Sequence, residues 1–134
     1  MQNSKWDLAS SPDDPAWDTF LTAMGVSETH RKKLAKIRPS EELRISGNVW
    51  TLTTRSELGD HEITFTLGEP VPATILYGGP DGTTVFTKDG GNKLVQTFRF
   101  EGKTATIIRE YSNGRMKVSC ATNGVSAERW YTGG

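Results

Sequence analysis

The stretch Lys103-Thr-Ala-Thr-Ile-Ile-Arg-Glu-Tyr-Ser-Asn-Gly-Arg-Met-Lys-Val-Ser-Cys-Ala-Thr-Asn-Gly-Val-Ser-Ala-Glu-Arg-Trp-Tyr131 predicts three consecutive antiparallel strands. Its Asn113-Gly114 and Asn123-Gly124 pairs suit two-residue hairpin turns, which require positive φ angles. The segments between these turns alternate apolar and polar side chains, as strands with one buried face do. The stretch therefore predicts a meander of neighbouring strands.

Two arginines lie on the apolar faces of this stretch. Because side chains alternate along a strand, each arginine shares its face with three residues at even spacing: Ala105, Ile107 and Tyr111 with Arg109, and Val125, Ala127 and Tyr131 with Arg129. The neighbouring acids, Glu110 and Glu128, fall on the opposite faces. A buried arginine stays charged and needs an anionic partner. We therefore expect a bound anion near Arg109 and Arg129, whereas we expect Arg44 and Arg99 to be solvated.

Turn residues divide most of the remaining chain into further strands. The first expected strand is Trp6–Ala9, and the later ones begin near Glu42, where Leu43 and Ile45 alternate. The expected strands after these are Val49–Arg55, His61–Leu67, Val71–Leu76, Thr83–Lys88, Leu94–Phe100, Thr104–Tyr111, Met116–Ala121 and Val125–Thr132. About ten strands joined by tight turns must close into a barrel or leave exposed edges.

A helix pair interrupts the strands once. Asp14 can cap a first helix that begins at Pro15, and Gly25 can end it. Its apolar stripe follows helical spacing at Trp17, Phe20, Leu21 and Met24. Ser27 can cap a second helix over Glu28 to about Arg38, which Pro39 ends. The sequence thus predicts a mainly β fold: a ten-stranded antiparallel up-and-down β-barrel, or β-clam, with a helix-turn-helix lid over about residues 14–38.

Composition restricts the function further. The 134 residues carry 16 basic and 16 acidic side chains, so no general attraction to nucleic acid is indicated. They fit a single domain over residues 1–134. A hydrophobic content of 34% suits a wide barrel with a partly polar interior. The single cysteine, Cys120, fits a reducing compartment, and no apolar leader or membrane-length run is present, so we expect a cytoplasmic location.

The chain resembles the intracellular lipid-binding proteins, which include the cytoplasmic fatty acid-binding proteins. The resemblance covers essentially the whole chain, because its motifs occur in the order and spacing of that family. These are Trp6, Phe20-Leu21-…-Met24-Gly25-Val26, Glu62-Ile-Thr-Phe-Thr-Leu-Gly68, Asp89-Gly-Gly-Asn-Lys-Leu-Val95, Ile108-Arg109-Glu110 and Arg129-Trp130-Tyr131. The resemblance implies the same barrel and a non-catalytic carrier that binds a long-chain fatty acid, with no separate cofactor and as a monomer.

The family motif also implies the site. Arg129 and Tyr131 match its arginine and tyrosine that hold the ligand carboxylate, and Arg109 matches its second arginine. Ten apolar residues are expected to line the tail site and the portal: Trp17, Phe20, Leu21, Met24, Leu34, Leu58, Phe65, Phe98, Met116 and Val118. The basic second helix is a candidate for transient contact with anionic membranes, while His30-Arg-Lys-Lys33 could instead be a nuclear signal.

Other functions stay open at this point. Retinoic acid or another amphipathic acid offers the same carboxylate as a fatty acid. A haem-binding barrel would need an axial ligand, for which His61 is the better candidate. An enzyme is disfavoured, because neither His30 nor His61 lies in a recognisable catalytic or metal motif and Cys120 shares an apolar face. A secreted lipocalin would bring a signal peptide and paired cysteines.

Overall fold

The computed structural model describes all residues from 1 to 134 and confirms the predicted architecture. Ten antiparallel strands form a nearly closed barrel, and two helices lie between the first and second strands. The elements are β1 (Ser4–Leu8), α1 (Pro15–Ala23), α2 (Glu28–Leu34), β2 (Ser40–Ser46), β3 (Val49–Arg55), β4 (His61–Phe65), β5 (Val71–Thr74), β6 (Asp81–Asp89), β7 (Lys93–Phe100), β8 (Lys103–Ser112), β9 (Arg115–Thr122) and β10 (Val125–Gly133).

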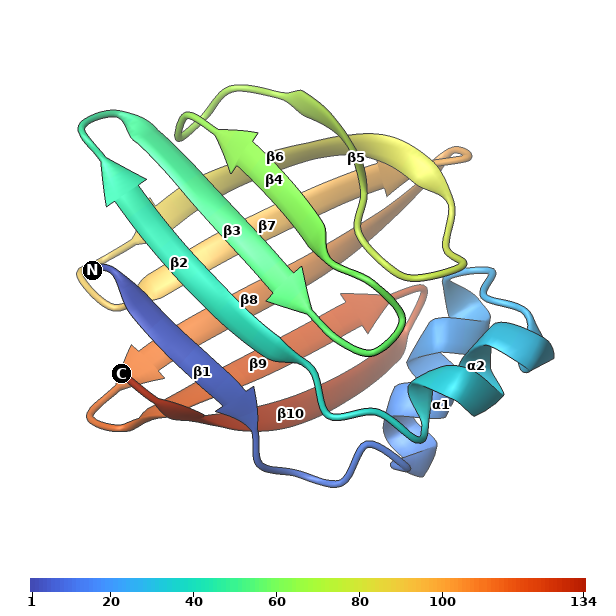
Figure 1. Cartoon of the computed structure of the whole chain (residues 1–134). Helices are drawn as coiled ribbons and strands as arrows, with labels where there is room; N and C mark the ends of the chain where they lie inside the picture. The colour runs from blue at the N-terminus through green and yellow to red at the C-terminus, as the bar shows by residue number, and fades with distance from the viewer.

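Hydrogen bonding follows chain order around the barrel. The strand order is β4-β3-β2-β1-β10-β9-β8-β7-β6-β5, so the first and last strands pair and the sheet ends at β4 and β5. Figure 1 shows β1 to β4 on the near wall and β7 to β10 on the far wall, with both helices at one end. The two chain termini lie at the opposite end. An interior between two walls is therefore covered by the helices at one end only.

Both expected two-residue hairpins are present, since Ser112 pairs with Arg115 and Val125 with Thr122, but in the first of these turns only Gly114 has a positive φ. Asn123 and Gly124 have φ angles of 47° and 75°, which is the paired positive φ of a type I′ turn. The adjoining register pairs Ala127 with Cys120 and Arg129 with Val118. The tight turn therefore fixes which side chains of β9 and β10 share the inner face.

The first helix forms as the sequence predicts. The side chain of Asp14 accepts a hydrogen bond from the Ala16 N–H, and Pro15 occupies the first turn. Ser27 caps α2 by accepting from the His30 N–H. The Arg31 guanidinium ties the helices together, donating to the Asp18 carboxylate at 3.0 Å and to the Val26 carbonyl at 2.7 Å. The lid is thus held as one unit.

The expected end of the second helix was wrong. The helix stops at Leu34 rather than near Arg38. Beyond it, the Lys36 and Ile37 N–H groups donate to carbonyls only three residues back, at 3.2 and 3.4 Å. Proline disfavours helical geometry in the residue before it, so the chain tightens into turns before Pro39. This places Ile37 and Pro39 beside the interior.

Candidate functional site

A cavity of ≈ 320 Å³ opens inside the barrel beneath the helices. It is bounded by side chains from α1, the end of α2, the β3–β4 and β5–β6 connections, and the inner faces of β7 to β10. Its lining residues are Trp17, Phe20, Leu34, Ile37, Pro39, Glu41, Thr54, Ser56, Leu58, Gly59, Asp60, His61, Thr74, Ile75, Leu76, Tyr77, Gly78, Gln96, Ile107, Arg109, Val118, Cys120, Arg129 and Tyr131. Its volume lies in the range of small-molecule sites.

Strand register brings the two predicted arginines to one row of the inner wall. Val118 on β9 is opposite Arg109 on β8 and opposite Arg129 on β10. Neighbouring strands are about 4.8 Å apart, so the two arginine backbones are separated by roughly 10 Å. In the next row, Met116 is opposite Tyr111 and Tyr131. All three predicted head-group residues, Arg109, Arg129 and Tyr131, line the cavity.

Arg129 is a buried cation without an anionic partner. Its residue is 6% exposed, and its Nε makes no hydrogen bond. The guanidinium carbon lies 4.2 Å from the centroid of the Trp17 ring on α1, within the range of a cation–π contact. Such a contact leaves the N–H groups at the guanidinium edge able to donate. Arg129 therefore presents charge and hydrogen-bond donors without a carboxylate to receive them.

Tyr131 adds a neutral donor on the same strand. Burial raises the pKa of its hydroxyl to about 12, so the phenol stays protonated at neutral pH. Alternation along β10 places Arg129 and Tyr131 on the same inner face. A cation and a hydroxyl in this arrangement suit a carboxylate, which accepts hydrogen bonds through both oxygens.

Arg109 has a protein partner that the sequence analysis missed. Its Nε donates to Glu41 Oε1 at 2.6 Å and its Nη2 approaches Glu41 Oε2 at 3.4 Å. Nη1 donates to Gln96 Oε1 at 2.9 Å, and the Gln96 amide donates in turn to the Thr84 hydroxyl. Burial disfavours the charged form of Arg109, but the adjacent Glu41 charge outweighs it and raises the pKa of Arg109.

The expectation that both inward arginines lack a protein carboxylate was therefore wrong for Arg109. Glu41 is 6% exposed and reaches across the barrel from β2 on the opposite wall. A signal for it existed, because Glu41 has the same parity as Leu43 and Ile45. The strand was expected to begin near Glu42, but β2 begins at Ser40, which brings Glu41 into the alternation. Whether Arg109 contacts a ligand stays a prediction.

The ten predicted apolar residues divide into two groups. Five line the cavity: Trp17, Phe20, Leu34, Leu58 and Val118. The other five are packed away from it in the core: Leu21, Met24, Phe65, Phe98 and Met116. Phe65 stacks on Phe86 with ring centroids 3.8 Å apart, and Phe98 stacks on Phe100. Side-chain alternation along the strands therefore predicted the inner face correctly for Phe65, Phe98 and Met116, but neighbouring side chains separate them from the cavity.

The lid and the opposite loop meet at the edge of the cavity. The His30 ring on α2 lies edge-on to the Tyr77 ring, with centroids 5.1 Å apart. Gly78 follows with a φ of +72°, and a Cβ atom there would overlap the His30 ring. This close approach between α2 and the β5–β6 connection therefore requires glycine at position 78.

Burial shifts the pKa of each remaining candidate reactive group in the direction that favours its neutral form. Burial lowers the pKa of His61, which lines the cavity with its Nε2 unpartnered. Burial also raises the pKa of the Cys120 thiol to about 12, against attack as a thiolate. This protonated state agrees with the interpretation of Cys120 as a packed thiol.

Comparisons with known proteins agree with this geometry. No family profile matches the chain. It is 36% identical over 115 residues to a fatty acid-binding protein of Tyrophagus putrescentiae, covering 86% of each chain. It is 31% identical over 127 residues to human fatty acid-binding protein 5, covering 95% of this chain and 90% of that one.

Solved structures show the same likeness. A Schistosoma mansoni fatty acid binding protein in complex with arachidonic acid gives a TM-score of 0.88 at 27% identity, covering 96% of this chain and 92% of that chain. A fatty acid-binding protein from Drosophila melanogaster brain gives a TM-score of 0.85 at 29% identity, covering 96% of this chain and 95% of that chain.

Neither helix of this chain is long and apolar enough to cross a bilayer.

Proposed function

Because this chain belongs to the fatty acid-binding protein family, we propose that it carries a long-chain fatty acid inside its barrel. Members of this family are binding proteins and not enzymes, which confirms the prediction that the chain is not an enzyme. The observation that carries the proposal is Arg129, a buried cation beside a cavity with no anion of its own. A ligand carboxylate would supply the missing charge.

In this proposal the head and the tail of the ligand are bound by different forces. Arg129 donates charge-assisted hydrogen bonds to the carboxylate, and Tyr131 donates its hydroxyl. Arg109 stays a predicted member of the site, but we assign the direct contact to Arg129 and Tyr131 because Glu41 already pairs with Arg109. Apolar side chains of the cavity take the tail, and each CH₂ removed from water contributes about 0.8 kcal/mol. No cofactor beyond the lipid is required.

Calorimetric titration with oleate tests this function. We expect delipidated protein at neutral pH to bind about one oleate per chain with micromolar affinity or tighter, since the tail supplies most of the free energy. The matched ligand is oleyl alcohol, which keeps the tail and lacks the anion. Equal affinity for the acid and the alcohol would contradict an anion site at Arg129. Tight binding of retinoic acid with none of oleate would favour the retinoid alternative.

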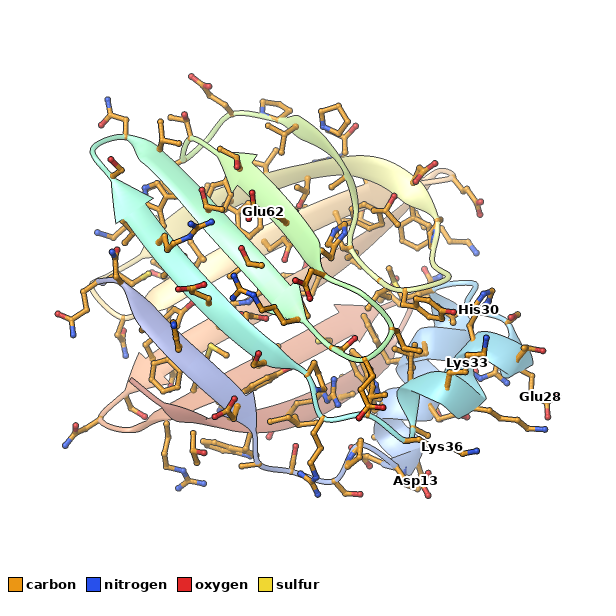
Figure 2. The ribbon with its side chains drawn as sticks, viewed as in Figure 1. Asp13, Glu28, His30, Lys33, Lys36 and Glu62 are labelled. Carbon is orange, nitrogen blue, oxygen red and sulfur yellow. The ribbon has the colours of Figure 1, made fainter.

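We also propose that α2 and the turn that follows it make transient contact with anionic membranes. The supporting observation is that Lys33 and Lys36 form no ion pair, whereas Arg31 and Lys32 are paired with Asp18 and Glu28. Figure 2 shows Lys33 and Lys36 at the helical end of the molecule. Each basic residue near an anionic surface contributes about 1 kcal/mol. A monomer in the cytoplasm, with its single cysteine buried, fits this role.

Charge removal on the lid tests this contact. In the double variant Lys33→Gln, Lys36→Gln, we expect transfer of a fluorescent fatty acid to phosphatidylserine-containing vesicles to slow by about thirtyfold, because roughly 2 kcal/mol of attraction is lost. The control pair is Lys88→Gln with Lys117→Gln, on strands β6 and β9 outside the lid. Equal slowing in both pairs, or no salt dependence in the wild type, would refute a specific role for α2.

A further inference from the structure

The interior of the barrel contains an unequal number of opposite charges. Arg109 and Arg129 are 8% and 6% exposed, and Glu41 is 6% exposed. Two cations and one anion leave a single positive charge in excess. The only other carboxylate that lines the cavity is Asp60, in the β3–β4 connection, where it faces Arg55 at 3.8 Å. The excess charge therefore belongs to Arg129, the interior arginine whose buried Nε makes no hydrogen bond.

The Glu41–Arg109 pair is held as a unit. The carboxylate meets the guanidinium through both oxygens, at 2.6 and 3.4 Å. Gln96 occupies a further guanidinium nitrogen at 2.9 Å, and Thr84 holds the Gln96 amide while donating to the Thr97 carbonyl. These contacts use three of the five N–H groups of Arg109, and the Glu41 carboxylate balances its charge. The ligand thus meets an interior whose second arginine is already neutralised.

We propose that Glu41 is an internal counter-ion that sets the interior to one excess positive charge and so selects ligands with a singly charged head. This rests on the proposed carrier function and adds the class of head group. A monocarboxylate balances Arg129 and leaves no charge unpaired. A phosphomonoester dianion brings a second negative charge that has no partner, and an unpaired charge away from water is costly. Glu41 therefore determines specificity by neutralising Arg109.

A comparison of two ligands with the same tail tests this inference. Dodecanoate and dodecyl phosphate are titrated calorimetrically at pH 8, where a phosphate monoester with a second pKa of about 6 is a dianion. We expect the wild type to favour dodecanoate. Glu41→Gln frees Arg109 and raises the excess charge to two, so the ratio of the two affinities should shift toward the phosphate by about tenfold or more.

The matched control lies next to Glu41 on the same strand. Glu42 points to the other face of β2 and pairs with Arg55 at 2.7 Å on the outside. Glu42→Gln makes the same change of charge and should leave the ratio at its wild-type value. An equal shift in Glu41→Gln and Glu42→Gln would mean that the overall charge of the protein is responsible, and it would overturn the proposal.

A second variant covers the case in which Glu41→Gln does not fold. The double replacement Glu41→Met, Arg109→Met removes the buried pair together, a change that folded proteins often tolerate. The excess charge stays at one, so the double variant should keep the wild-type preference for dodecanoate. A shift toward the phosphate in this variant would overturn the proposal. If dodecanoate fails to bind the wild type, the carrier function fails too, whereas binding with an unchanged ratio in Glu41→Gln refutes the charge selection alone.

Discussion

Replacement of Arg129 by glutamine is expected to weaken fatty acid binding by about a hundredfold while leaving the empty protein more stable. Loss of a buried, hydrogen-bonded charge pair costs about 2–5 kcal/mol of binding free energy, and a hundredfold corresponds to the lower part of that range. In the empty barrel the same guanidinium has no anion and an unpartnered Nε. Its removal relieves a desolvation cost of about 1–3 kcal/mol, less the cation–π contact with Trp17.

Two measurements on delipidated protein check this prediction. Calorimetric titration with oleate gives the change in affinity, and urea denaturation gives the free energy of unfolding without ligand. We expect that free energy to rise by about 1 kcal/mol. The control is Arg99→Gln, since Arg99 is exposed on β7 and should change neither quantity. Loss of stability in Arg129→Gln to the extent of its loss of affinity would show that Arg129 has a structural role instead.

Replacement of Glu41 by glutamine is expected to have the opposite effect on stability. Removal of one partner from a buried ion pair costs about 3–5 kcal/mol, because the other charge is left without compensation. Here the abandoned charge is Arg109, whose side chain is as buried as that of Glu41. We therefore expect the free energy of unfolding of the empty protein to fall by about 3 kcal/mol or more, measured by urea denaturation.

The adjacent carboxylate again supplies the control. Glu42 forms ion pairs on the outer face with Arg55 and Lys5, whose side chains are 45% and 79% exposed. Glu42→Gln therefore leaves no buried charge unpaired and should cost much less stability than Glu41→Gln. An anionic ligand should also stabilise Glu41→Gln more than the wild type, because it can replace the lost counter-ion of Arg109. Equal free energies of unfolding for Glu41→Gln and Glu42→Gln would show that Glu41 does not stabilise the buried charge of Arg109.

The two variants separate two arginines that sequence reasoning treated alike. Arg109 and Arg129 occupy the same row of the inner wall, each opposite Val118. One is neutralised by the protein and the other is left to the ligand. If both arginines bound the ligand directly, Glu41→Gln would have little effect on the stability of the empty protein. Arg109 would then also lack an anionic partner in the empty barrel, as Arg129 does.

Local sequence signals are sufficient to predict the topology. Turn pairs such as Asn123-Gly124 fix the hairpins, and side-chain alternation in the strands depends only on local backbone geometry. The caps at Asp14 and Ser27 are also local, since each side chain bonds to an N–H within three residues. For the same reason, parity alone placed Arg109, Arg129 and Tyr131 on the inner wall. The end of α2 was predicted incorrectly, because the sequence before Pro39 does not mark the residue at which the helix stops. The helix was expected to reach about Arg38 and ends at Leu34.

The contacts between the inward groups depend on tertiary packing. Glu41 and Arg109 are separated by 68 positions and come from opposite walls, so no pattern within either strand pairs them. The stacking of Trp17 on Arg129 likewise depends on how α1 is seated over β10. Packing also decided that Phe65 and Phe98 are covered by neighbours instead of lining the cavity. The physical reason is the same in each case: alternation assigns a side chain to a face, but closure of the barrel determines its neighbours and hence which charge is left for a ligand.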